Sequence, residues 1–128
     1  MKVVPLKTAK ALKGNRSRSY QMVGPEVTGS HRFMITVVHV EPGGSTPLHE
    51  HRSVDSMYFI LEGRAEVTDG NTAKVLGPDN AVYFPAGGSH GIRNAGRTRL
   101  RYLSCHAPPY EIAELYKSWE RAYVTTGG

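Results

Sequence analysis

Hydrophobic and polar residues alternate over short stretches along most of the chain, which predicts β-strands rather than long helices. Residues 31–40 are rich in β-branched and aromatic side chains, and this stretch ends at the turn signal Pro42-Gly43-Gly44. Further strands are expected over 57–62, 64–68, 73–76, 81–84, 91–94 and 99–105, with a hairpin at 69–71. Many short strands at close spacing favour an all-β barrel or sandwich.

The end of the chain has a different pattern. Apolar residues recur at helical spacing between charged ones, at Ile112, Leu115, Tyr116, Trp119 and Tyr123. Acidic residues come early in this stretch and basic residues late, which suits the dipole of a helix. We therefore expect a short C-terminal helix over 110–123 that packs on the barrel or on a partner subunit.

The composition indicates one domain. A chain of 128 residues can bury a core of its own but has no room for a second domain. Its 14 glycines and 8 prolines are spread along the chain and do not mark a linker. We expect an N-terminal segment over 1–30, a barrel over 31–109 and the tail helix.

The chain carries a formal net charge of +5, and several of its cations lie near the start. Lys7, Lys10 and Lys13 are spaced like one face of a short helical turn, and Arg16 and Arg18 follow. No aromatic residues or binding motif accompany them as a nucleic-acid site would require. We interpret this stretch as a solvated basic segment and expect no nucleic-acid partner.

Cysteine usage and hydropathy indicate the compartment. Cys105 is the only cysteine, so no disulfide can form within the chain, which is typical of a reducing environment. No apolar run approaches the ~20 residues of a membrane span, and the apolar stretch near the start is too short for a signal peptide. A cytoplasmic protein with no membrane association is expected.

Three histidines indicate a metal centre. His49 and His51 lie two residues apart, so on an extended segment their imidazoles point to the same side. His90 comes much later, directly after the turn-like residues 85–89. A β-scaffold can gather two ligands from one strand and a third from a neighbouring strand. Because imidazole is the commonest protein ligand of transition metals, we expect one divalent ion, iron (Fe), manganese (Mn), nickel (Ni) or zinc (Zn).

The segments around these histidines resemble the two motifs of the cupin superfamily. Residues 43–51, GGSTPLHEH, followed by Gly63, are similar to the first motif, and residues 85–94, PAGGSHGIRN, are similar to the second. The chain is thus identified as a small single-domain cupin from about residue 33 to 109. This resemblance implies a double-stranded β-helix, or jelly-roll, barrel with the metal inside. It does not define a reaction, because cupins catalyse many different ones.

One position departs from the family pattern. Cupins usually have a glutamate seven residues before the closing glycine of the first motif, and here Ser56 takes that place. Asp55 is the nearest carboxylate, but it lies one residue out of register, which on a strand means the opposite face. We expect a three-histidine site, with Asp55 left open as a fourth ligand.

Alternation along the strands predicts which side chains point inward. If His90 faces the interior, Ile92 and Asn94 do too, while Arg93 faces water. The other residues expected inside are Ser56, Tyr58, Ile60, Leu100, Tyr102, Ser104 and His106. His106 is then a fourth ligand, a general base or a hydrogen-bonded core histidine. His39 is expected at the barrel rim and His31 at the surface.

The function expected is that of a metal-dependent enzyme on a small anionic molecule. Three neutral ligands preserve the Lewis acidity of the ion and leave positions for substrate or dioxygen. The resemblance puts dioxygenases first, because cupins without the glutamate include several. An isomerase, lyase or decarboxylase would use His106 or Tyr102 for proton transfer, with Ser56 holding a water or substrate oxygen. A non-enzymatic binding protein is the third alternative.

A homodimer is the expected assembly. The chain presents more apolar surface than a small protein buries alone. This surface consists of Leu103 on the outer face, the strand over 33–40, and Ile112, Leu115 and Trp119 of the tail. A second copy related by two-fold symmetry would cover these surfaces.

Overall fold

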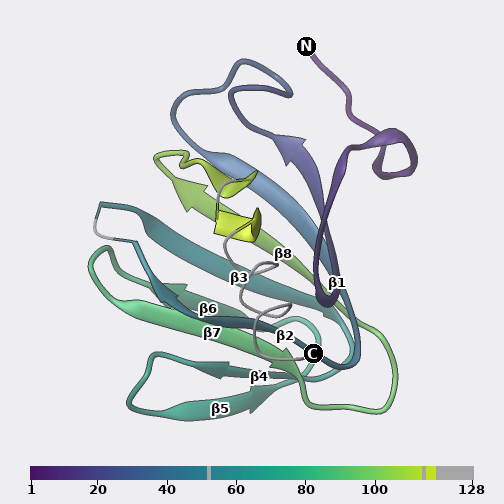
Figure 1. Cartoon of the computed structure of the whole chain (residues 1–128), viewed down its shortest axis with the longest axis vertical. Coiled ribbons are helices and arrows are strands. Elements are labelled where there is room, and N and C mark those ends of the chain that lie inside the picture. Colours follow the sequence, from purple (N-terminus) through teal and green to yellow (C-terminus); the bar gives the residue numbers. More distant parts are fainter. Residues whose placement is uncertain (52, 114, 118–128) are drawn as a thin grey trace.

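The chain folds into a curled β-sheet whose described strand pairs are antiparallel (Figure 1). The computed structural model describes residues 1–51, 53–113 and 115–117. A short 3-10 turn, η1 (Leu6–Thr8), comes first. The strands that follow are β1 (Ala11–Val23), β2 (Met34–Glu50), β3 (Asp55–Glu62), β4 (Ala65–Thr68), β5 (Ala73–Leu76), β6 (Ala81–Phe84), β7 (Ser89–Asn94) and β8 (Leu100–Ala107).

The long strand β2 organises the sheet. The strand order is β5-β4-β7-β2-β8-β3-β6. In addition, β1 pairs with the first part of β2, on the edge opposite to β8. The first part of β2, up to Val40, pairs with β8, and its last part, from Ser45 onward, pairs with β7. Because one strand joins two partners, the sheet curls into the half-barrel of Figure 1, which confirms the all-β jelly-roll prediction.

The interior is filled by every second residue of the strands, as the pleat requires. In β2, Met34, Thr36, Val38 and Val40 are buried while their neighbours are not. The core cluster consists of Val38, Val40, Tyr58, Ile60, Ala65, Val67, Phe84, Ile92, Leu100 and Tyr102. The inward set predicted from alternation is confirmed throughout, and Arg93 lies outside as expected.

The prediction that the strand ends in a turn at residues 42–44 is wrong, because β2 continues through these residues to Glu50. Gly43 has a φ of +83°, which bends the strand without ending it. At Gly44 a Cβ atom would lie 2.7 Å from Val40 Cγ1 and 2.8 Å from the Asn15 carbonyl oxygen. The glycines therefore allow β1 to approach a bent strand closely.

The basic residues near the start of the chain, Lys7, Lys10, Lys13, Arg16 and Arg18, are exposed as expected. The sequence did not predict, however, that residues 11–23 form a strand, β1, which pairs with β2. Its inward residues Ser17, Ser19 and Gln21 are polar, so the strand has no hydrophobic alternation. The helical face suggested by Lys7, Lys10 and Lys13 does not exist, because the three residues lie in a 3-10 turn, a connection and a strand.

The tail helix is confirmed for its described part. Residues 112–113 and 115–117 are helical, and Tyr116 is buried with its ring close to Gly14 of β1. Trp119 and Tyr123, which complete the predicted apolar stripe, lie outside the described residues. Among the described helical residues, no segment is long and apolar enough to cross a membrane.

Candidate metal centre

The strand pairing brings the three predicted histidines together. His49 of β2 and His90 of β7 are directly paired across the two strands. His51 follows just after β2, and its carbonyl oxygen accepts a hydrogen bond of 2.9 Å from the Gly87 N–H. One ring nitrogen from each histidine lies within 4.8 Å of the others. This spacing suits three ligands around a single ion.

A hydrogen bond sets the tautomer of one of the three rings, and the buried Nε2 atoms of the other two have no hydrogen-bond partner among the described residues. His49 Nδ1 lies 2.7 Å from the Pro47 carbonyl oxygen, so this nitrogen carries the proton and Nε2 carries the lone pair. The Nε2 atoms of His51 and His90 are buried and have no hydrogen-bond partner among the described residues. Buried polar atoms are nearly always satisfied. Two such atoms beside a third imidazole fit the ligation of a metal ion.

Burial keeps these imidazoles neutral. It lowers the pKa of His51 to about 4 and that of His90 to about 3, with a smaller contribution from the neighbouring histidines. The pKa of His49 is lowered as well, mainly by burial. The ring of Phe84 stacks on His90 with a centroid distance of 4.9 Å, which shields it from water. Neutral imidazole is the form that binds a metal.

His106 is held between two serine hydroxyls. Its Nδ1 lies 2.6 Å from Ser56 Oγ and its Nε2 lies 2.6 Å from Ser104 Oγ. Burial lowers its pKa to about 3, so the ring is neutral and makes one bond as donor and one as acceptor. Its ring lies 5.8 Å from that of His51. In this arrangement His106 borders the three histidines, with both ring nitrogens engaged by serines.

Two other candidate residues lie away from this point. Asp55 is exposed and accepts a hydrogen bond of 2.8 Å from the Ala86 N–H, on the outer side of β3 as the register argument predicts. Tyr102 is buried in the core, with its hydroxyl 3.3 Å from Thr46 Oγ1. Its ring contacts Tyr58, which in turn lies 5.7 Å from His90. Tyr58 therefore links Tyr102 to His90.

The sequence reasoning missed Tyr110. Its ring lies 4.2 Å from His51 and 5.0 Å from His106, and its N–H points to Met34 Sδ at 3.5 Å. Burial raises the pKa of its hydroxyl, which is therefore neutral. Tyr110 follows Pro108-Pro109 beyond both motifs, in a stretch where neither strand nor helix periodicity assigns a direction. The only signal was an aromatic residue just after the strand that carries His106.

Fold and site together define a jelly-roll protein with a histidine-lined centre inside the barrel. The chain belongs to the cupin family: the family model described as Cupin domain matches residues 36–106, more than half of the chain.

Several proteins are similar to this chain. MJ1618 of Methanocaldococcus jannaschii is 30% identical over 70% of this chain and 72% of its own length. A predicted oxalate decarboxylase from Thermotoga maritima has a TM-score of 0.74 at 21% identity, over 85% of this chain and 100% of that one. The polyketide cyclase RemF of Streptomyces resistomycificus has a TM-score of 0.72 at 26% identity, over 85% and 80%. Among longer relatives, the chain spans only 18% of the mannose-1-phosphate guanylyltransferase ManC of Salmonella typhimurium.

Proposed function

We propose that this protein is an enzyme that uses one divalent transition metal, held by His49, His51 and His90, to act on a small anionic molecule. The observation that carries the proposal is the pair of buried, unpartnered Nε2 atoms on His51 and His90. They lie beside His49, whose tautomer is set by Pro47. Leaving two such atoms unsatisfied would cost about 1–3 kcal/mol each, and ligation of an ion removes that cost.

The donor set favours an anionic substrate. When bound, a divalent ion supplies Lewis acidity and, in the case of iron, redox chemistry with dioxygen. The three imidazoles add no negative charge, so the centre keeps a net positive charge for a carboxylate or enolate. Phe84 and Tyr110 cover two sides of the histidines and limit the access of water. Oxygenase chemistry is the first reaction to test.

A non-oxidative reaction is the second candidate, because the centre has a proton-carrying group beside it. His106, bonded to Ser56 and Ser104, can hold a proton on either nitrogen while its serine partners adjust. Such a group suits an isomerase, lyase or decarboxylase. The likeness to the polyketide cyclase RemF at 26% identity also supports a non-oxidative reaction.

Metal analysis tests the site. Protein purified without chelator is expected to contain close to one equivalent of iron, manganese, nickel or zinc. His90→Ala and His49→Ala should each contain less than about a fifth of that amount. His31→Ala, which removes an exposed histidine, is the matched control and should keep the metal. Equal metal in all four proteins would contradict the assignment.

Oxygen consumption separates the two reaction types. The metal-loaded protein is screened against small carboxylic, keto and hydroxy acids with an oxygen electrode and, in parallel, by product analysis without oxygen. Substrate-dependent oxygen uptake that is lost in His90→Ala supports the oxygenase. Turnover without oxygen supports the second candidate. Binding of metal and ligand with no turnover would contradict both and favour a binding protein.

The expected assembly is a homodimer, and it stays a prediction. Phe33 and Leu61 are exposed by 41% and 37%, and Leu103 lies on the outer face. A second copy would cover such residues. Light scattering at micromolar concentration should give about twice the mass of 14.1 kDa. A mass of one chain would contradict the dimer.

A further inference from the structure

A cavity of about 360 Å³ lies beside the metal centre, between the start of the chain, β1 and the C-terminal segment. Its walls are mainly apolar and include Leu12, Val23, Met34 and Ile112. The charged residues Lys10, Glu26 and Glu111 also line it, and all three are exposed. This volume lies within the range of small-molecule sites, about 300–1,000 Å³, and such sites are lined mostly by apolar groups. The cavity is formed by segments outside the two histidine motifs.

Tyr110 belongs to both the cavity and the metal centre. It lines the cavity, while its ring lies 4.2 Å from the ring of His51. Met34 connects the same two places: it lines the cavity, accepts the Tyr110 N–H through its sulfur, and is paired in the sheet with His106. Tyr110 is therefore in contact with both the cavity and the ring of His51.

We propose that this cavity receives the apolar part of a small carboxylic acid whose carboxylate binds at the metal centre, and that Tyr110 sets the length of acid that fits. The proposal rests on the proposed metal function and adds the substrate class. A neutral three-histidine centre favours an anionic end, and the apolar walls favour a hydrocarbon or aromatic body. Both requirements meet at Tyr110, whose ring must turn aside for the longer acids.

The test uses a series of straight-chain carboxylates, from acetate to decanoate, as probes. Binding to the Co²⁺-loaded protein is followed by the visible absorption of the ion and by titration calorimetry. Acetate reports on the metal centre alone. Each added methylene that enters the cavity should increase affinity, by up to about fourfold. The increase should stop once the cavity is full.

Two variants fill the cavity from opposite walls. Ile112→Trp acts from the tail helix and Leu12→Trp from β1, and either should abolish the dependence on chain length while acetate binds as before. Val75→Trp, at an exposed position on β5 outside the cavity lining, is the matched control and should behave as the wild type. Tyr110→Ala joins the two spaces, so the dependence on chain length should become steeper. Cobalt content is measured for each variant to verify that the centre is intact.

The outcomes separate this inference from the proposed function. Acetate that leaves the cobalt spectrum unchanged would contradict the proposed function. Acetate binding without any dependence on chain length would overturn only the cavity proposal and would mean that the space is closed to ligands, for example by another segment of this chain. Equal binding of decanoate to the metal-free protein would overturn the link between cavity and metal.

Discussion

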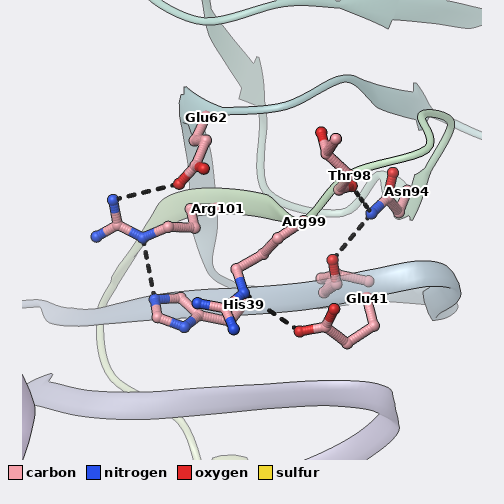
Figure 2. A network of polar contacts seen from close by, with 8 residues as sticks. His39, Glu41, Glu62, Asn94, Thr98, Arg99 and Arg101 are labelled. Atoms are coloured by element: carbon pink, nitrogen blue, oxygen red, sulfur yellow. Dashed lines mark hydrogen bonds and ion pairs between the residues drawn. The ribbon is translucent and has the colours of Figure 1, made fainter.

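The inner and outer faces of β2 and β8 each contain a histidine, and the two histidines have different surroundings. His106 faces inward, where two serine hydroxyls at 2.6 Å engage its ring nitrogens. His39 faces outward, where its Nε2 accepts a hydrogen bond of 3.1 Å from Arg101 (Figure 2). Its ring lies 5.0 Å from that of Tyr20. Both histidines are neutral, but the surroundings that keep them neutral differ.

The outer face contains several pairs of oppositely charged side chains. Among the described residues, the inner face contains no Lys, Arg, Asp or Glu. Arg101 lies 3.7 Å from Glu62, and Arg99 lies 3.2 Å from Glu41 (Figure 2). These pairs are partly exposed, so water and salt screen them. Inside the barrel, water cannot replace a lost partner, and each unsatisfied group bears its full desolvation cost. Removing an inner polar group should therefore destabilise the fold more than removing an outer one.

The largest effect is expected for His106→Leu. The substitution leaves the hydroxyls of Ser56 and Ser104 buried without their partner, which should lower the free energy of unfolding by about 2–4 kcal/mol. His39→Leu, the outer counterpart on the paired strand, should cost clearly less. Urea denaturation of the metal-free proteins measures both. Equal losses would mean that the two faces do not differ in the way described.

The second prediction concerns the two serines. Ser56→Ala and Ser104→Ala should each lower the free energy of unfolding by about 1–3 kcal/mol, because each leaves one nitrogen of His106 unpaired. In the double variant the two effects should not add, since both act through one ring. A double-mutant cycle by urea denaturation measures the coupling. Strict additivity would contradict a shared network.

How much of this contrast could be predicted from sequence depends on the strand. In β7, the motif around His90 placed that residue inward, and parity then gave the inward position of Ile92 and the outward position of Arg93. In β8, placing Arg101 outward gave the inward position of His106. The spacing of His49 and His51 and the motif around His90 also indicated the metal centre. In these cases the periodicity of the strand coincides with the chemistry of its side chains.

The sequence failed where polar residues are buried or where the chain leaves regular structure. In β1, Ser17 and Ser19 point inward without hydrophobic alternation, so no strand was predicted there. The bond of His106 to Ser56 depends on strand register between β3 and β8, which no local pattern specifies. Tyr110 reaches His51 from beyond β8, by a path that only the folded chain defines.

A smaller effect is expected for Arg101→Gln on the outer face. The variant loses the ion pair with Glu62, which at 3.7 Å and partial exposure should contribute less than about 1 kcal/mol. The difference from the wild type should shrink further as sodium chloride is raised from 0.05 to about 1 M, because salt screens the pair. Thermal unfolding at each salt concentration measures this. A loss as large as that in Ser56→Ala would contradict the contrast between the faces.

The smallest effect concerns the pH dependence of stability through His39. Partial burial, together with the guanidinium groups of Arg101 and Arg99, holds the pKa of His39 below its ordinary value of 6.5 in the folded state. Below that pH the unfolded chain takes up a proton at residue 39 that the folded chain does not, so this group makes the free energy of unfolding fall as the pH drops toward the folded-state pKa.

His39→Gln keeps a hydrogen-bond acceptor for Arg101 but cannot titrate. The variant should therefore lose slightly less stability than the wild type between pH 7.5 and about 5, as measured by urea denaturation across that range. His31→Gln controls for the loss of an exposed imidazole. If His39→Gln lost more stability than the wild type on acidification, the outer network would favour a charged His39, and the comparison with His106 would fail.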